Sequence, residues 1–234
     1  MNEHVNTDFS QRVVIHSKQL PWMTSPMPGV ERRALDRIGG EIARATSIVR
    51  YAAGSKFSGH LHSGGEEFIV LEGVFQDENG DYPAGSYVRN PPQSSHVPYS
   101  NDGCIIFVKL WQFQPSDRHQ KKVQMNTLGP QAVMYSDDHE QVSYFDIAPN
   151  DTLYIDAHSG IEVLVMSGTL NESNDVLEQH SWLRLPKDTN LHAVAGNEGA
   201  KLWLKRNHLN DVHKQVERVQ AAAKSKQCQT RQAC

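Results

Sequence analysis

The sequence predicts an all-β protein made of two tandem β-rich repeats followed by a short C-terminal α-helix. Short runs of β-branched and aromatic residues alternate with clusters of Gly, Pro, Asn and Asp, and helical spacing of apolar residues is scarce before residue 209. The chain also matches itself at an offset of 96 residues. Its 234 residues suffice for two domains of about 115 residues each. These three observations together predict the fold class.

The first repeat holds the clearest strand patterns. Residues 66–71 are apolar on both pleat faces beyond the two glutamates that begin the run, so we expect both faces to be covered, as in a packed double sheet. The cover could be the second repeat or another copy of the chain in a homodimer. Residues 77–81, with their Asn-Gly pair, predict a hairpin turn. We expect strands over residues 46–51, 56–62, 66–72, 85–89 and 104–113.

The sequence pattern changes three times in the rest of the chain. Residues after Phe113 lose their apolar alternation, which is typical of a linker, and a second β-rich block follows. Val212, Val216, Val219 and Ala223 recur at helical spacing, which predicts one amphipathic helix. We expect residues 224–234 to be disordered. The expected domains are an N-terminal barrel over 1–115, a linker over 116–129, a second, degenerate barrel over 130–208, and a helix and tail over 209–234.

Three histidines and one glutamate in the first repeat have the spacing of metal ligands. Residues two apart on a strand share a face, so His60 and His62 can bind one ion. The segment Ser63-Gly64-Gly65 lets the chain bend so that Glu66 returns from the next strand. His96 follows a Pro-rich loop. Such a set suits Zn, Fe, Mn, Ni or Cu, and burying it without coordination would be costly, so we expect one divalent transition metal, with Zn preferred and Fe, Mn or Ni as alternatives.

These residues resemble the cupin family. Its first motif, G-x5-H-x-H-x3,4-E-x6-G, is matched by Gly54, His60, His62, Glu66 and Gly73. Its second motif is matched by Gly85, Pro91 and His96, while Gln93 and Ser100 stand where the family has Gly and Asn. The resemblance implies that each repeat is a jelly-roll barrel of the cupin type.

Residues 20–112 more narrowly resemble the cupin domain of the ChrR anti-sigma factors. In that family the zinc-dependent cupin domain senses stress, and a separate N-terminal helical domain with an H-x3-C-x2-C motif holds the sigma factor. The present sequence lacks that motif. The resemblance therefore implies a stress-sensing or regulatory metal protein, without direct binding of a sigma factor.

The offset of 96 residues suggests a second site. His62 and Glu66 fall on His158 and Glu162, and His96 falls on His192, whereas His60 falls on Asp156. Lys109 likewise falls on Lys205, and Gly73 meets Gly168 after a one-residue adjustment. These four residues, one Asp, one Glu and two His, could bind a metal through a set of ligands with more oxygen character than the first site. The alternative, which we favour, is a degenerate barrel that keeps only remnants of its ligands.

The four ligands leave sensing and catalysis open. A metal with free coordination positions could bind a small molecule and act as a dioxygenase or lyase on a small diketone-like or oxidised substrate, whereas a closed tetrahedral zinc site would suit a sensor. Candidates for a general acid or base are Tyr51, Tyr87, Arg89 and Tyr99, each of which also fits a place in a barrel wall or rim. We assign no catalytic residue on this basis.

Composition excludes several classes of partner. The chain has 23 Lys and Arg against 27 Asp and Glu, and no basic run beyond Lys121-Lys122, so we expect no nucleic-acid partner. No apolar stretch approaches membrane-spanning length, which predicts a cytoplasmic protein without a membrane partner. The three cysteines lie far apart and are expected to be ordinary reduced thiols.

Overall fold

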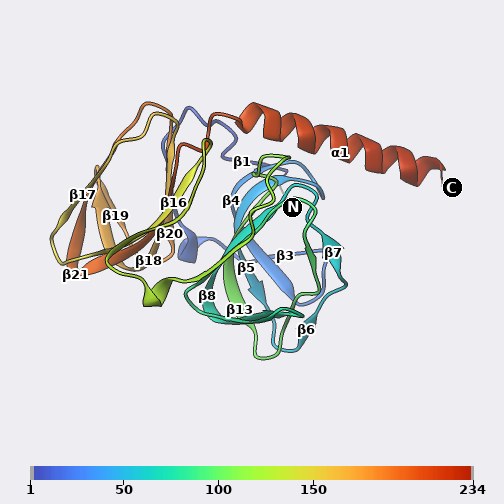
Figure 1. Cartoon of the computed structure of the whole chain (residues 1–234), viewed down its shortest axis with the longest axis horizontal. Coiled ribbons are helices and arrows are strands. Elements are labelled where there is room, and N and C mark those ends of the chain that lie inside the picture. The colour runs from blue at the N-terminus through green and yellow to red at the C-terminus, as the bar shows by residue number, and fades with distance from the viewer. Residues whose placement is uncertain (1–2, 233–234) are drawn as a thin grey trace. The chain divides into compact units, whose positions relative to one another are not determined.

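A computed structural model describes residues 3–232 and confirms a mostly β architecture with one C-terminal helix (Figure 1). The chain forms two compact units. The first comprises residues up to Thr7, Trp22–Val123 and the chain from Val212 onward, and the second comprises Asp8–Pro21 and Gln124–Asp211. Each unit is built on its own antiparallel sheet of the jelly-roll type, so the predicted fold class is correct.

The first unit is organised around strand β8, Glu66–Asp77. The sheet order is β1-β4-β5-β13-β8-β10-β14, and β7 with β11 forms a separate two-stranded ladder. Residues 66–70 of β8 are all buried, as the apolar pattern on both faces predicts. The other strands of this unit are β1 (His4–Val5), β3 (Met23–Thr24), β4 (Val30–Ile38), β5 (Arg44–Tyr51), β6 (Ser55–Lys56), β7 (His60–Leu61), β9 (Gly80–Pro83), β10 (Ser86–Asn90), β11 (Ser95–His96), β12 (Tyr99–Ser100), β13 (Cys104–Leu110) and β14 (Lys121–Gln124).

The second unit repeats this plan around strand β18, Ile161–Glu172. Its sheet order is β15-β16-β21-β18-β20-β2. Its core is a cluster of aliphatic side chains that includes Ile161, Val163, Leu185 and Leu191. The remaining elements are β2 (Val13–His16), η1 (Ser17–Gln19), η2 (Met125–Thr127), β15 (Gln131–Ser136), β16 (Gln141–Ile147), β17 (Thr152–Ile155), β19 (Asp175–Leu177), β20 (Ser181–Leu185) and β21 (Leu191–Arg206).

The boundaries of the two units differ from the expected division at residues 115 and 130. Strand β2, near the N-terminus, pairs with β20 and so belongs to the second unit. Arg12 strengthens this attachment through an ion pair with Glu172 at 2.5 Å. Within the expected linker, residues 121–124 form β14 on the edge of the first sheet, next to β10. Short, polar edge strands such as β14 lack the apolar alternation that would identify them in a sequence.

The C-terminal helix α1, Val212–Gln232, is longer than its apolar pattern predicts. Val219 is buried, and none of the four residues of the predicted apolar face is exposed. The helix continues through most of the segment expected to be disordered, and Cys234 lies outside the described residues. Alanine, lysine, glutamine and arginine dominate residues 220–232, and their high helix propensity accounts for the continuation.

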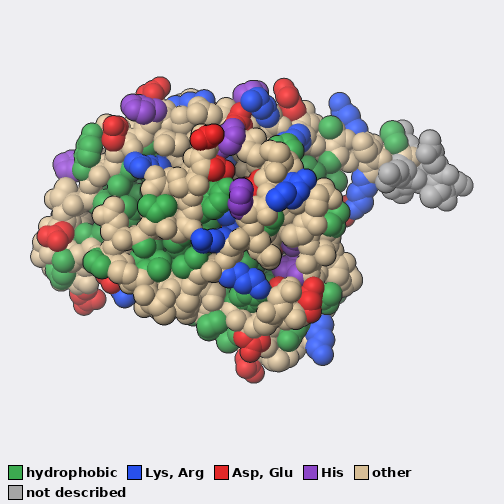
Figure 2. Space-filling model, in the orientation of Figure 1, with side chains coloured by type: hydrophobic (Ala, Val, Ile, Leu, Met, Phe, Trp, Pro, Cys, Tyr) green, Lys and Arg blue, Asp and Glu red, His purple; other side chains and the backbone are tan. Residues whose placement is uncertain are grey.

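Two observations concern membrane and nucleic-acid partners. Within residues 3–232, no helix is long and apolar enough to cross a membrane. On the face shown in Figure 2, acidic and basic side chains are interspersed, and no broad basic patch gathers there.

Candidate metal centre

The first unit brings His60, His62, Glu66 and His96 together. One ligand atom from each lies within 4.8 Å of the others. Strand β7 carries His60 and pairs with β11 so that His60 stands directly opposite His96. The three imidazole rings have centroids 4.6–5.1 Å apart. The structure thus gathers all four residues that the spacing in the sequence singled out.

A glycine turn between β7 and β8 makes this convergence possible. Gly65 has φ +78°, a conformation that side chains disfavour. The space that a Cβ atom of Gly65 would need is filled by the side chain of Phe113, and Trp111 fills the corresponding space beside Gly64. These two contacts fix the turn, and Glu66 follows it as the first residue of β8.

The distances between ligand atoms fit a small divalent ion. Nε2 of His62 and Nε2 of His96 each lie 3.6 Å from Oε2 of Glu66. Metal–ligand bonds of about 2.0–2.2 Å place neighbouring ligand atoms about 3.0–3.6 Å apart. Nε2 of His62 is buried and makes no hydrogen bond. Coordination of a metal ion would explain why this buried nitrogen, beside a carboxylate, has no hydrogen-bond partner.

Burial sets the ionisation of the ligands when no metal is bound. Burial, followed by repulsion from His60, lowers the pKa of His62 to about 4. Burial also lowers the pKa of His96, although Glu66 opposes that shift. For Glu66 itself, burial raises the pKa, against the attraction of His96 and His60. Neutral imidazoles are the form that binds a metal, so the lowered pKa values prepare His62 and His96 for coordination at neutral pH.

Two residues that sequence reasoning missed orient the ligands. Oδ2 of Asp77 lies 3.2 Å from Nδ1 of His96, which leaves Nε2 of that ring to face the other ligands. Asn90 donates a hydrogen bond to Oε2 of Glu66 at 3.4 Å. Asp77 was visible in the sequence only as part of a turn, and Asn90 as a residue before two prolines. Neither position carries a local signal, because their roles arise from pairing between distant strands.

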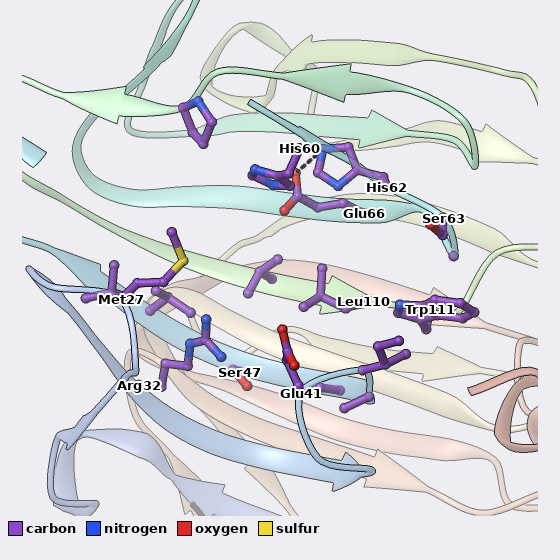
Figure 3. A pocket seen from close by; sticks show the side chains of 18 of the residues that line it. Met27, Arg32, Glu41, Ser47, His60, His62, Ser63, Glu66, Leu110 and Trp111 are labelled. Carbon is purple, nitrogen blue, oxygen red and sulfur yellow. Dashed lines mark ion pairs between the residues drawn. The ribbon is translucent and has the colours of Figure 1, made fainter. Parts of the chain in front are cut away.

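Three of the four candidate ligands, His60, His62 and Glu66, form part of the wall of a cavity of about 310 Å³ inside the first barrel (Figure 3). His60 is exposed, whereas the other three ligands are buried. This volume lies at the lower end of the range for small-molecule sites. The rest of the wall is mainly apolar, with a few polar groups from β4, β5 and the loop between them: Arg32, Arg37, Glu41, Ser47 and Tyr51.

Only Tyr51 among the four candidate acids and bases lines this cavity. Burial, followed by the nearby Glu66, raises the pKa of its phenol, so Tyr51 is a hydrogen-bond donor rather than a base at neutral pH. Tyr87 instead donates a hydrogen bond to Glu67 at 2.6 Å, and Arg89 pairs with Asp117 at 2.6 Å. These two side chains have structural roles away from the ligands. Tyr99 is not part of the cavity wall.

The residues of the possible second site do not lie together. Asp156, His158 and His192 are exposed, whereas Glu162 is fully buried. Glu162 forms an ion pair with His208 at 3.4 Å. Among the residues that the structure describes, these four do not form a cluster able to bind a metal.

The register of the strands explains why the offset of 96 does not place these residues at the positions of the first site. In the first unit β8 pairs Glu67 with Lys109, and in the second unit β18 pairs Glu162 with Lys205. Glu162 therefore corresponds to Glu67, at an offset of 95 rather than 96. A shift of one residue along a strand moves a side chain to the opposite face.

At the correct offset, every ligand position of the second unit is apolar. Ile155 pairs with Leu191 in the second unit, as His60 pairs with His96 in the first. The next two positions follow the same arithmetic, with 62 + 95 giving Ala157 and 66 + 95 giving Ile161. All four side chains belong to or pack against the aliphatic core of the second unit: Ile155, Ala157, Ile161 and Leu191. The second barrel has replaced the ligands with a hydrophobic core.

Residues 10–114 match the family model of the ChrR cupin-like domain. The chain is a cupin. The matched segment contains all four clustered residues of the first barrel, and the repeated architecture makes the protein a bicupin with one candidate metal centre. No curated protein matches the sequence.

Solved structures share the fold of this cupin across both barrels. A putative dioxygenase from Nostoc punctiforme has a TM-score of 0.68 and 13% identity, with 87% of this chain and 85% of that chain covered. The bacterial pirin YhhW from Escherichia coli in complex with nickel(II) has a TM-score of 0.66 and 13% identity, with coverage of 84% and 98%. A variant of oxalate decarboxylase from Bacillus subtilis has a TM-score of 0.57 and 9% identity, with coverage of 83% and 76%. At these identities the likeness establishes the fold alone.

Proposed function

We propose that the first barrel is a metal-dependent enzyme, an oxygenase or related lyase that acts on a small dicarbonyl substrate. The observation that supports this proposal is the cavity of about 310 Å³, whose wall includes three of the four candidate ligands, His60, His62 and Glu66. A six-coordinate ion held by four protein groups keeps two coordination positions free, and here they would face the cavity. A closed sensor site needs no such space.

The side chains around the centre have separable roles in this proposal. His60, His62, Glu66 and His96 would hold a divalent transition metal, which supplies Lewis acidity toward a carbonyl oxygen and, as Fe(II) or Mn(II), an electron for dioxygen. Asp77 keeps the ring of His96 in the orientation that coordination requires.

The remaining cavity groups act on the substrate. Tyr51 keeps its proton and can donate a hydrogen bond to a substrate oxygen inside the cavity. The apolar side chains on the wall exclude water from the same space, which strengthens each of these polar interactions.

Oxygen consumption tests this function directly. Protein reconstituted in turn with Fe(II), Mn(II), Ni(II) and Zn(II) is supplied with pentane-2,4-dione and related diketones in an oxygen-electrode cell. We expect steady consumption with at least one redox-active metal, and its loss in His62→Ala. The matched control is His158→Ala, which alters an exposed histidine of the second barrel and leaves activity unchanged. X-ray absorption showing four-coordinate zinc without a solvent ligand in the purified protein would contradict the proposal.

The second candidate function is a metal-dependent stress sensor. Its support is the match of residues 10–114 to the ChrR cupin-like domain. In that case a zinc ion would be closed by the four ligands, and a signal would act through ligand oxidation or displacement. Steady oxygen consumption that depends on His62 excludes this candidate, whereas stoichiometric zinc release by an oxidant without turnover favours it.

A further inference from the structure

Arg32 lies in the cavity wall, on the far side of the cavity from the metal ligands. On β4 it pairs with Val49, whose side chain belongs to the core of the first barrel, so Arg32 also projects into the barrel. Figure 3 shows its guanidinium directed into the cavity opposite His60 and Glu66. Tyr51 lies within electrostatic range of both Glu66 and Arg32, which connects the two ends of the cavity.

Arg32 has no acidic partner among the described residues. Its Nε is buried and makes no hydrogen bond. The arginine next to it, Arg33, instead stacks over the ring of Trp22 at 4.0 Å. A guanidinium stays cationic in proteins, so a buried one is normally paired with a carboxylate or phosphate. Arg32 is half-buried and therefore presents to the cavity a guanidinium whose Nε lacks a hydrogen-bond partner.

The charges around the cavity favour an anion. Arg37 also lines it, but its guanidinium donates to the backbone oxygens of Gly39 and Gly40. Of the two acidic residues in the wall, Glu41 has a side chain that is 77% exposed and pairs with Lys226. Glu66 in the wall and Asp77 beside His96 offset the charge of a divalent metal, and Arg32 and Arg37 leave the cavity with a net positive charge.

We propose that Arg32 binds the carboxylate of the substrate, and that the substrate is a small dicarbonyl acid whose oxygens at the other end reach the metal. This inference rests on the proposed function and adds the substrate class to it. The planar guanidinium can form two parallel hydrogen bonds with a carboxylate, which fixes both the position and the orientation of the bound molecule. A neutral diketone of equal size fills the same space without satisfying Arg32.

Two matched probes test the inference. The first is 4,6-dioxoheptanoate, a β-diketone with a distal carboxylate, and the second is its methyl ester, which lacks the charge. Binding is measured by isothermal titration calorimetry to protein loaded with Ni(II) or Zn(II). We expect the acid to bind about ten to a hundred times more tightly than the ester, the range expected for charge-assisted hydrogen bonds.

Three variants separate a specific carboxylate site from general charge attraction. Arg32→Met removes the guanidinium and should abolish the preference for the acid, and Arg32→Lys should retain part of it. Arg33→Met makes the same change in net charge one position along β4 and should leave the preference intact. If Arg32→Met fails to fold, the comparison of acid with ester in the wild type and in Arg32→Lys still decides the matter.

The outcomes distinguish this inference from the proposed function. Equal affinity of the wild type for acid and ester overturns the role of Arg32, as does equal loss of preference in Arg33→Met. Absence of binding by both probes at millimolar concentration also overturns it. A separate measurement tests the proposed function. Solvent proton relaxation of protein loaded with Mn(II) reports whether the metal carries exchangeable coordinated water, and its absence would overturn the proposed function.

Discussion

At the scale of single residues, burial distinguishes two of the candidate ligands from two histidines of the second repeat. His62 and His96 are buried, whereas His158 and His192 at the possible second site are exposed. Burial removes the hydration that would stabilise a protonated imidazole, so a buried histidine stays neutral. The same property that prepares the site for a metal makes the metal-free protein sensitive to acid.

The stability of the metal-free protein should therefore fall between pH 6.5 and pH 4. The pKa of His62 is lowered to about 4, so the unfolded chain binds this proton more tightly than the folded one within that window. The loss is at most about 3 kcal/mol and is complete below pH 4. Urea unfolding of chelator-treated protein at pH 7 and pH 5 measures it.

The variant His62→Leu isolates this contribution. It cannot take up the proton, so its free energy of unfolding should fall less from pH 7 to pH 5 than that of the wild type. His158→Leu, which changes an exposed histidine, should follow the wild type. An equal fall in His62→Leu and the wild type would contradict the assignment.

At the scale of elements, the sequence was informative about strands and unreliable about register. The ligands of the first barrel were predictable because His60 and His62 are two residues apart and a Gly-Gly turn precedes Glu66. In contrast, the offset of 96 came from matching identical residues, whereas strands β8 and β18 align at an offset of 95 residues. Residue identity does not show which face of a strand a side chain occupies, because the hydrogen-bonded pairing of the strands decides that.

Other elements depended on contacts that no local pattern contains. Residues 56–62 were expected to form one strand, and the structure breaks them into β6 and β7 around Phe57, which is buried in the barrel core. Strand β13 ends at Leu110 because Trp111 takes a φ of +62° and its backbone N–H bonds to the oxygen of Gly65. The attachment of β2 to β20 joins residues 165 or more positions apart, which is beyond any local pattern.

Helix α1 is attached to the first unit through a buried polar cluster. Gln215 accepts a hydrogen bond from Nε of Arg44 at 2.8 Å and donates one to the backbone oxygen of Gln112 at 2.9 Å. Arg44 is fully buried and also pairs with Asp36 at 3.2 Å. Because a buried polar network is costly when one member is removed, Gln215 should matter more than its neutral side chain suggests.

We expect Gln215→Ala to destabilise the first unit by about 1–3 kcal/mol, since it removes two buried hydrogen bonds and one of the partners of a buried guanidinium. Urea denaturation measures the change, and hydrogen exchange should show faster exchange in α1. The control is Glu217→Ala, an exposed position on the same helix. Similar stability of the two variants would show that the cluster does not hold the helix.

At the scale of the whole molecule, the two barrels share a plan but differ in what fills the corresponding place. In both units a buried glutamate on the central strand pairs across the sheet with a buried lysine, Glu67 with Lys109 and Glu162 with Lys205. The opposite face of the same strands carries the candidate metal site in the first unit and aliphatic core in the second. The second barrel is therefore stabilised by apolar burial where the first carries a candidate metal site.

Metal binding should consequently act on one barrel only. A ligand that binds the folded state at a hundred times its dissociation constant adds about 2.7 kcal/mol of stability to the structure that contains its site. Hydrogen exchange with and without metal should show added protection in β7, β8 and β11, and unchanged exchange in β17, β18 and β21. Elemental analysis of anaerobically purified protein should give one metal per chain. Two metals per chain, or equal added protection in β18, would contradict the apolar replacement of the second site and favour the second metal site that the sequence repeat left open.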